Sequence, residues 1–184
     1  MALLQLDGGT TYTDFEEIAE ELAPLRVHLR HFELDTSLVF LGLSDQDVLT
    51  ESEKRNILQL HESLFEFLKQ ERCYLWSDLL NVHPGSPHLQ PLMATYSPYH
   101  VHTAPEAFYV LAGRAIFRFV RPDGSQMQLL VEPQDYLHIS AGVEHGFSLD
   151  ASLWFKAVRY FTTVEGWVPQ YTKTQMGNFL GKRR

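Results

Sequence analysis

Apolar positions recur at helical spacing in two stretches before residue 72, and both stretches therefore predict helices. The first begins at Thr13 and Glu16, which have the spacing of a capping box, and Pro24 ends it. A second capping-box pair, Thr50 and Glu53, opens a longer apolar stripe that runs to Leu68. Between them, residues 26–32 alternate as a strand does. We expect residues 1–72 to be rich in helices.

Beyond Tyr74 the pattern changes to short strand-like runs separated by glycine and proline. Residues 81–90 read as a loop and residues 121–124 as a turn. The predicted strands are Phe108–Leu111, Ala115–Val120, Met127–Val131, Tyr136–Ile139 and Leu153–Phe161. Many short strands at such spacing are typical of a sandwich or barrel, here at about residues 74–172 and followed by a short tail. We expect the helices to pack outside this barrel or across one end.

Composition narrows the class of protein without changing this picture. A chain of 184 residues with 45% hydrophobic residues buries one core, and no internal repeat or linker divides it, so residues 1–184 are expected to form one domain. The formal net charge of −8 argues against nucleic-acid binding, since the only basic cluster is Lys182, Arg183 and Arg184. We expect a monomer.

No apolar run is long enough for a membrane span, and residues 1–7 lack the features of a secretory signal, which predicts a cytoplasmic protein. Cys73 is the only cysteine, so an internal disulfide and a thiolate cluster are excluded. We interpret Cys73 as a buried apolar thiol that follows a helix.

Candidate chemistry centres on His100 and His102, which a strand would direct to the same face, with Glu106 shortly after them. His145, after a predicted strand and turn, is a candidate for a third imidazole. Three imidazoles and a carboxylate suit a borderline ion such as Fe(II), Ni(II), Co(II) or Mn(II). In six-coordinate geometry this set leaves two positions open for substrate or dioxygen, which indicates chemistry rather than a structural site.

A histidine on a strand is more often a surface or hydrogen-bonded residue, so His100 and His102 alone are weak evidence for a metal site. The spacing strengthens it, because His100, His102, Glu106 and Gly113 fit the first cupin motif. Asp135, Gly142 and His145 fit a looser second motif, although Gln134 and Ser140 stand where cupins often have glycine and proline. The fold class predicted is therefore mainly β, a cupin jelly-roll barrel with N-terminal helices packed outside.

The other histidines are weaker candidates. Alternation cannot fix the direction of His138 across the turn before His145, so a supporting role behind the metal ligands stays open. The remaining five are interpreted as surface or packing residues: His28, His31, His61, His83 and His88.

Beyond the cupin motifs, the chain resembles the acireductone dioxygenases of methionine salvage. Residues 78–84 (Asp-Leu-Leu-Asn-Val-His-Pro) look like that family's segment before the metal ligands. Residues 161–168 (Phe-Thr-Thr-Val-Glu-Gly-Trp-Val) look like its closing signature, which ordinary cupins lack. The resemblance implies one Fe(II) or Ni(II) per chain, held by His100, His102, Glu106 and His145.

In the implied reaction, an acireductone binds the metal as a dianion through two oxygens, and dioxygen then attacks and cleaves it. In this family the products with Fe(II) are a 2-keto acid and formate, and with Ni(II) carbon monoxide is also released. We expect Phe108, Phe147, Trp167 and Tyr99 to line the substrate pocket, with no catalytic residue beyond the metal site.

Two positions depart from the family. Tyr99 replaces a usual acidic residue before the first histidine, and Phe108 replaces a usual arginine two residues after the glutamate. Arg159 and Lys156 are candidate replacement cations; they fall on opposite faces of one strand, and for each we favour a place at the rim in water. Two further hypotheses stay open: a cupin dioxygenase acting on another small enediol or keto compound, and a non-catalytic metal-binding cupin.

Overall fold

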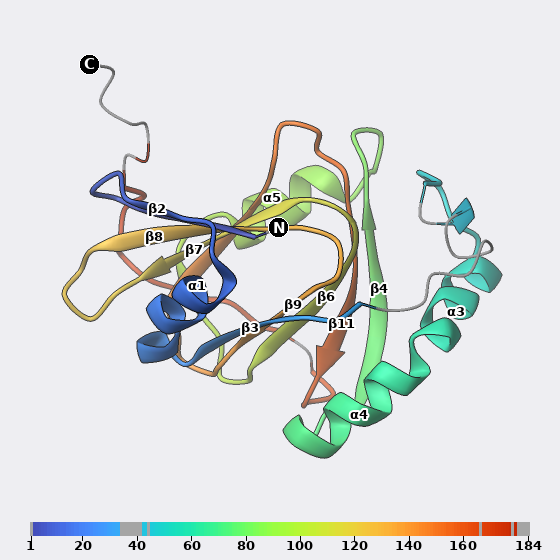
Figure 1. The fold of residues 1–184 in the computed structure, drawn as a ribbon. Helices are drawn as coiled ribbons and strands as arrows, with labels where there is room; N and C mark the ends of the chain where they lie inside the picture. The colour runs from blue at the N-terminus through green and yellow to red at the C-terminus, as the bar shows by residue number, and fades with distance from the viewer. Residues whose placement is uncertain (1, 34–41, 44, 166, 178, 180–184) are drawn as a thin grey trace.

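Two antiparallel sheets form the frame of the protein (Figure 1). The structure is a computed structural model, and it describes residues 2–33, 42, 43, 45–165, 167–177 and 179. The seven-stranded sheet has the order β12-β5-β10-β7-β8-β1-β2. Its strands are β1 Leu3–Leu6, β2 Thr11–Tyr12, β5 His100–Val101, β7 Ala115–Val120, β8 Gln126–Val131, β10 His145–Leu149 and β12 Gln170–Tyr171. Gly166 and the basic cluster at residues 182–184 lie outside the described residues.

The second sheet has five strands in the order β3-β9-β6-β11-β4. They are β3 Val27–His31, β4 Trp76–Val82, β6 Glu106–Gly113, β9 Asp135–Ile139 and β11 Phe155–Phe161. Side chains from the inner faces of both sheets form one core, in which Phe117, Phe119 and Phe155 are fully buried. Two facing antiparallel sheets around one core confirm the mainly β fold class expected for a cupin.

Helices pack against the core between the sheets and, as expected, on the outside of the barrel. In α1, Phe15–Leu22, the buried residues Ile18 and Leu22 belong to the core between the sheets. Helices α3, Glu51–Leu60, and α4, Glu62–Arg72, lie alongside β4 in Figure 1 and pack on the outer face of the five-stranded sheet. That contact buries Ile57, Leu64 and Leu68 of the helices together with Tyr109, Val158 and Tyr160 of the sheet.

Local details of the helices differ from the sequence prediction. The N-cap of α1 is Asp14 rather than Thr13, because its carboxylate Oδ1 accepts the backbone N–H groups of Glu16 and Glu17 at 3.0 and 3.1 Å. The capping box of Thr50 and Glu53 is confirmed. The stripe that follows it is broken at His61, whose Nδ1 donates to the carbonyl oxygen of Ile57 at 2.7 Å.

Some elements were not predicted. Strand β1 pairs with β8, and α5, Leu89–Tyr96, begins within the stretch expected to be a loop. Pro91 lies in the first turn of α5, where proline costs no internal hydrogen bond. A short connecting 3-10 helix, η1 Ala23–Leu25, follows α1.

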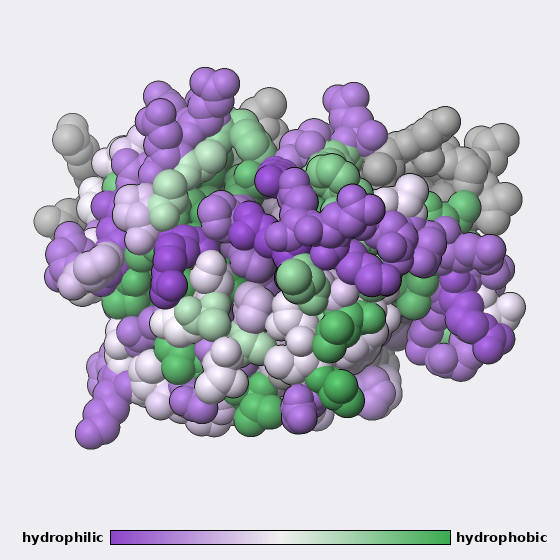
Figure 2. Space-filling model, turned by 90° about the horizontal axis from the view of Figure 1, so that it is seen from below, coloured by the Kyte–Doolittle hydropathy of each residue, from purple (hydrophilic) through white to green (hydrophobic). Residues whose placement is uncertain are grey.

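The surface mixes polar and apolar side chains. In Figure 2 a band of hydrophilic residues crosses the face shown, and hydrophobic residues appear in small groups around it. Cys73, expected to be buried, is exposed at the C-cap of α4, where its backbone φ of 58° ends the helix. Among the described helices, none combines the length and the apolar character that a membrane crossing requires.

Candidate metal centre

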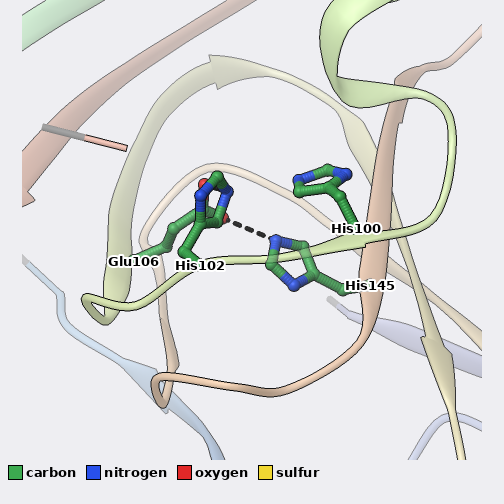
Figure 3. Close-up of side chains that lie close together, drawn as sticks. All are labelled: His100, His102, Glu106 and His145. Carbon is green, nitrogen blue, oxygen red and sulfur yellow. Dashed lines mark hydrogen bonds and ion pairs between the residues drawn. The ribbon is translucent and has the colours of Figure 1, made fainter. Parts of the chain in front are cut away.

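Four side chains from three strands and one loop meet inside the barrel (Figure 3). His100 on β5 lies directly opposite His145 on β10 in the sheet register. His102 follows β5, and Glu106 is the first residue of β6 in the other sheet. All four are less than 5% exposed, so the group sits away from bulk water between the two sheets.

Glu106 contacts two of the three histidines. Its Oε1 lies 2.8 Å from Nε2 of His102, and its Oε2 lies 3.0 Å from Nε2 of His145. One potential ligand atom from each residue lies within 4.8 Å of all the others. Ligands about 2.1 Å from one ion lie at most about 4.2 Å apart, so a small contraction would bring all four ligand atoms within bonding distance of one ion.

The buried His100 shows that the donor set fits a cation. Its Nε2 has no hydrogen-bond partner among the described residues, although the side chain is 0% exposed. A buried nitrogen without a partner is costly unless something outside the protein binds it. An ion held by imidazole nitrogens and one carboxylate oxygen would satisfy it.

Backbone carbonyls orient two of the imidazoles. Nδ1 of His100 donates to the carbonyl oxygen of Pro98 at 2.7 Å, and Nδ1 of His145 donates to that of Val143 at 2.8 Å. Because a carbonyl oxygen only accepts, each Nδ1 carries a proton and each neutral ring keeps its Nε2 lone pair for a ligand bond. The backbone thus presets both tautomers for metal binding.

The electrostatics favour the metal-binding protonation states of His100 and Glu106, but not that of His102. Burial, reinforced by the neighbouring His145, lowers the pKa of His100 to about 4. Burial opposes ionisation of Glu106, but the charges and hydrogen bonds of His145 and His102 outweigh it and lower the pKa of the carboxyl. Burial likewise acts to lower the pKa of His102, and its contact with Glu106 raises it overall. A neutral His100 and an ionised Glu106 are metal-binding forms.

A cavity of about 20 Å³ adjoins His100 and Glu106. Three of the residues expected in the pocket line it: Phe108, Phe147 and Trp167. The Phe108 and Trp167 ring centroids are 4.9 Å apart, and Trp167 donates from Nε1 to the carbonyl oxygen of Pro105 at 3.1 Å. The cavity wall is therefore largely aromatic. Leu80, Leu92 and Tyr96 also line it, and the sequence did not indicate them.

Tyr99, also expected in the pocket, lies elsewhere. Its hydroxyl donates to Oε1 of Gln126 at 2.8 Å, and its carbonyl oxygen accepts from the backbone of Thr172 at 3.0 Å. Because Tyr99 is adjacent to His100, the alternation of an extended chain sends the two side chains to opposite sides. The change from an acidic residue at this position therefore leaves the cavity wall untouched.

The two candidate cations do point to opposite faces of β11, but neither is a solvated rim charge. Lys156 is 0% exposed and donates from Nζ to the carbonyl oxygens of Leu43 and Gln46 at 2.8 and 3.0 Å. Arg159 lines the cavity. There it pairs with Asp78, from Nε to Oδ1 at 2.7 Å and from Nη2 to Oδ2 at 2.5 Å.

His138 does not support the metal ligands. On β9 it lies opposite Ala107, and its Nδ1 is 2.8 Å from the hydroxyl of Tyr74 on the outer side of the sheet. Its ring is thus directed away from Glu106, the neighbour of Ala107 in sequence. The potential metal-binding group found among the described residues does not include the other five histidines, His28, His31, His61, His83 and His88.

Comparison with known proteins places these features in one family. Residues 10–169 match the model of the ARD/ARD′ family. The acireductone dioxygenase of Trichormus variabilis is 62% identical over 182 residues, which cover 99% of this chain and 100% of the relative. The enzyme of the same name from Nostoc sp. is 61% identical over the same shares. The structure of the acireductone dioxygenase from Bacillus anthracis with a cadmium ion in its active centre superimposes with a TM-score of 0.84, at 25% identity, over 93% of this chain and 98% of that one.

Proposed function

The chain belongs to the ARD/ARD′ family, and from this membership we propose that it is a metal-dependent acireductone dioxygenase. Its substrates are a small acireductone and dioxygen. The observation that carries the proposal within this chain is the convergence of His100, His102, Glu106 and His145 beside a cavity. Both cupin motifs and the resemblance of residues 161–168 to the family's closing signature agree with it.

We propose that these four residues hold one Fe(II) or Ni(II) per chain. The donor set of three imidazoles and one carboxylate suits either ion. When bound, the ion supplies Lewis-acid chemistry and a template for the two substrate oxygens. Glu106 contributes the negative charge of the set, and the Pro98 and Val143 carbonyls keep the His100 and His145 rings turned toward the ion.

The cavity wall shapes what reaches this centre. Phe108, Phe147 and Trp167 are each less than 9% exposed and surround the approach with apolar surface. Such surroundings exclude water from the reacting atoms and strengthen the electrostatic contacts within the site. Trp167 is fixed by its hydrogen bond to Pro105, so the wall is rigid at that point.

We further propose that the protein acts in methionine salvage in the cytoplasm, as a monomer, without nucleic-acid or membrane partners. The formal net charge of −8 agrees with the absence of a nucleic-acid footprint. With Fe(II) the expected products are a 2-keto acid and formate, and with Ni(II) carbon monoxide is also released.

The test is oxygen uptake by metal-stripped protein reloaded separately with Fe(II) or Ni(II), supplied with chemically prepared acireductone, with formate and carbon monoxide assayed. Uptake above the nonenzymatic background that depends on added metal supports the proposal. His145→Ala serves as the matched variant and should fall to background. Background uptake by the wild-type protein with one ion per chain verified would overturn the proposal.

A second candidate, a dioxygenase acting on another small enediol or keto compound, is favoured by one observation. Phe108 lines the cavity where the resemblance leads one to expect an arginine, so that wall is more apolar. If the substrate has changed in this way, Phe108→Arg should raise turnover of acireductone. Unchanged or lower turnover of that variant would count against this candidate.

A further inference from the structure

Phe108 and Arg159 are direct partners on neighbouring strands. Phe108 on β6 lies opposite Arg159 on β11 in the antiparallel register, and both side chains line the cavity beside the metal centre. Residues paired across two strands project to the same face, with Cβ atoms about 5 Å apart. Position 108 carries no cation, but Arg159 on the neighbouring strand places one on the same wall of the cavity.

Arg159 is held rigidly enough to act as a fixed charge. Asp78 on β4 is its cross-strand partner on the other side, and the two form a bidentate ion pair. The guanidinium also lies over the rings of Phe161 and Trp167, 5.3 and 5.4 Å from their centroids. Two of its five N–H groups serve Asp78, which leaves three for a ligand.

The charges of the cavity leave a role for this arginine. Glu106 carries the negative charge of the metal set, and the substrate of the proposed reaction is itself an anion. Among the described residues that line the cavity, Arg159 is the one permanent cation. It is the group best placed to offset the repulsion between Glu106 and an incoming oxyanion.

The position of Arg159 also connects two spaces. Arg159, Leu80 and Leu92 line both the small cavity and an adjoining groove of about 440 Å³. The cavity itself, about 20 Å³, has room for roughly one water molecule. An acireductone is larger, so its chain must extend past these three residues or displace them. The guanidinium therefore meets the substrate at the junction.

We propose, on the basis of the proposed function, that Arg159 is the specificity-determining residue for the anionic substrate, and that Asp78 is its positioning residue. The guanidinium donates hydrogen bonds to an oxyanion of the acireductone from β11, in place of an arginine at position 108 on β6. The chain thereby keeps selectivity for an anion with Phe108 in its wall.

The test compares Arg159→Met, Arg159→Lys and the wild-type protein, all loaded with Ni(II), by calorimetric titration with acireductone in the absence of dioxygen. We expect the Kd of Arg159→Met to rise by about tenfold to a hundredfold. Arg159→Lys keeps the charge but loses the bidentate geometry, so its Kd should lie between those of the wild type and Arg159→Met. Binding of a neutral hydroxyketone of the same chain length should be unchanged in all three. Arg114→Met, which removes a surface arginine paired with Asp150, is the matched control and should bind as the wild type does.

Relocating the charge separates a substrate contact from a structural role. Phe108→Arg added to Arg159→Met should recover part of the lost affinity, because the two positions face each other. The proposal is overturned if Arg159→Met binds the anion as tightly as the wild type. It is equally overturned if the variant loses affinity for the neutral compound to the same extent, or if it no longer retains one ion per chain. These measurements need no turnover, so an inactive wild type that still binds the anion through Arg159 would refute the proposed reaction alone.

Discussion

Arg118 on β7 donates from Nη2 to the backbone carbonyl oxygen of Ser97, 2.8 Å away. Ser97 precedes Pro98, whose own carbonyl oxygen accepts the Nδ1 proton of His100. The arginine is 6% exposed, and its Nη1 donates to Oγ of Ser148 at 2.9 Å. A buried cation thus holds the segment that orients the first candidate ligand.

From this contact we expect Arg118→Met to weaken metal binding by about tenfold to a hundredfold, the usual effect of losing a group that orients a ligand. The measurement is a competition titration of Ni(II) against a chromogenic chelator. Ser148→Ala, which removes only the other contact of the guanidinium, should change the affinity much less. Equal affinities for Arg118→Met and the wild type would show that Pro98 is held by other contacts.

Metal removal should lower stability, because an ion that binds only the folded chain adds to its free energy of unfolding. At a free Ni(II) concentration about 100 times the Kd, the gain is about 2.7 kcal/mol, seen as a rise in Tm. His145→Ala should show little of this rise, whereas His88→Ala, which alters an exposed histidine, should show all of it. A full rise in His145→Ala would remove that residue from the ligand set.

Stability should also fall in acid because of His138. Burial, with help from the positive charges of Arg72, His28 and Arg30, lowers the pKa of His138 from its ordinary value of 6.5 to about 3. Between these values the unfolded chain binds the proton and the folded chain does not, so stability present above pH 6.5 is lost as the pH falls toward 3.

Urea unfolding at about pH 7 and about pH 5 measures this effect. His138 alone accounts for a loss of about 2 kcal/mol over that interval. His138→Gln should lose correspondingly less, whatever its absolute stability. An identical pH dependence in both proteins would mean that His138 becomes protonated without unfolding the chain.

Two glycines with similar backbones should respond differently to alanine. Gly113 and Gly124 have φ values of 73° and 82°, which disfavour any side chain. A Cβ at Gly113 would lie 2.0 Å from the carbonyl oxygen of Trp154, whereas nothing lies within 4 Å of one at Gly124. Gly124→Ala should cost about 1 to 2 kcal/mol, from the backbone alone.

Gly113→Ala must in addition move one strand against its neighbour, so we expect a loss above about 3 kcal/mol in the same urea measurement. Equal losses in the two variants would indicate that the backbone at Trp154 can move away from Gly113 at little cost in free energy. The glycine of the first cupin motif is thus explained by a close approach of two backbones.

Sequence periodicity predicted what depends on neighbouring residues. The inward direction of Phe108 follows from Glu106 by alternation along one strand, and the Thr50 capping box is equally local. The same alternation, applied to His100, would have turned Tyr99 away from the pocket, so that signal was present in the sequence.

Other features depend on contacts between distant segments. The direction of Arg159 is settled by pairing with Asp78 on β4, and that of His138 by Tyr74, neither of which periodicity reveals. Helix α5, which brings Tyr96 to the cavity, begins within a stretch rich in proline and glycine that reads as loop. Tertiary packing overrides such local signals.

Strand β12 has a consequence for solubility. It pairs with β5 through Tyr171 opposite His100, and it forms one border of the seven-stranded sheet. Without it, the strand that carries His100 would itself be the border, with unpaired N–H and C=O groups open to a strand of another molecule. A short stretch near the end of the chain therefore shields the most chemically sensitive strand from edge-to-edge aggregation.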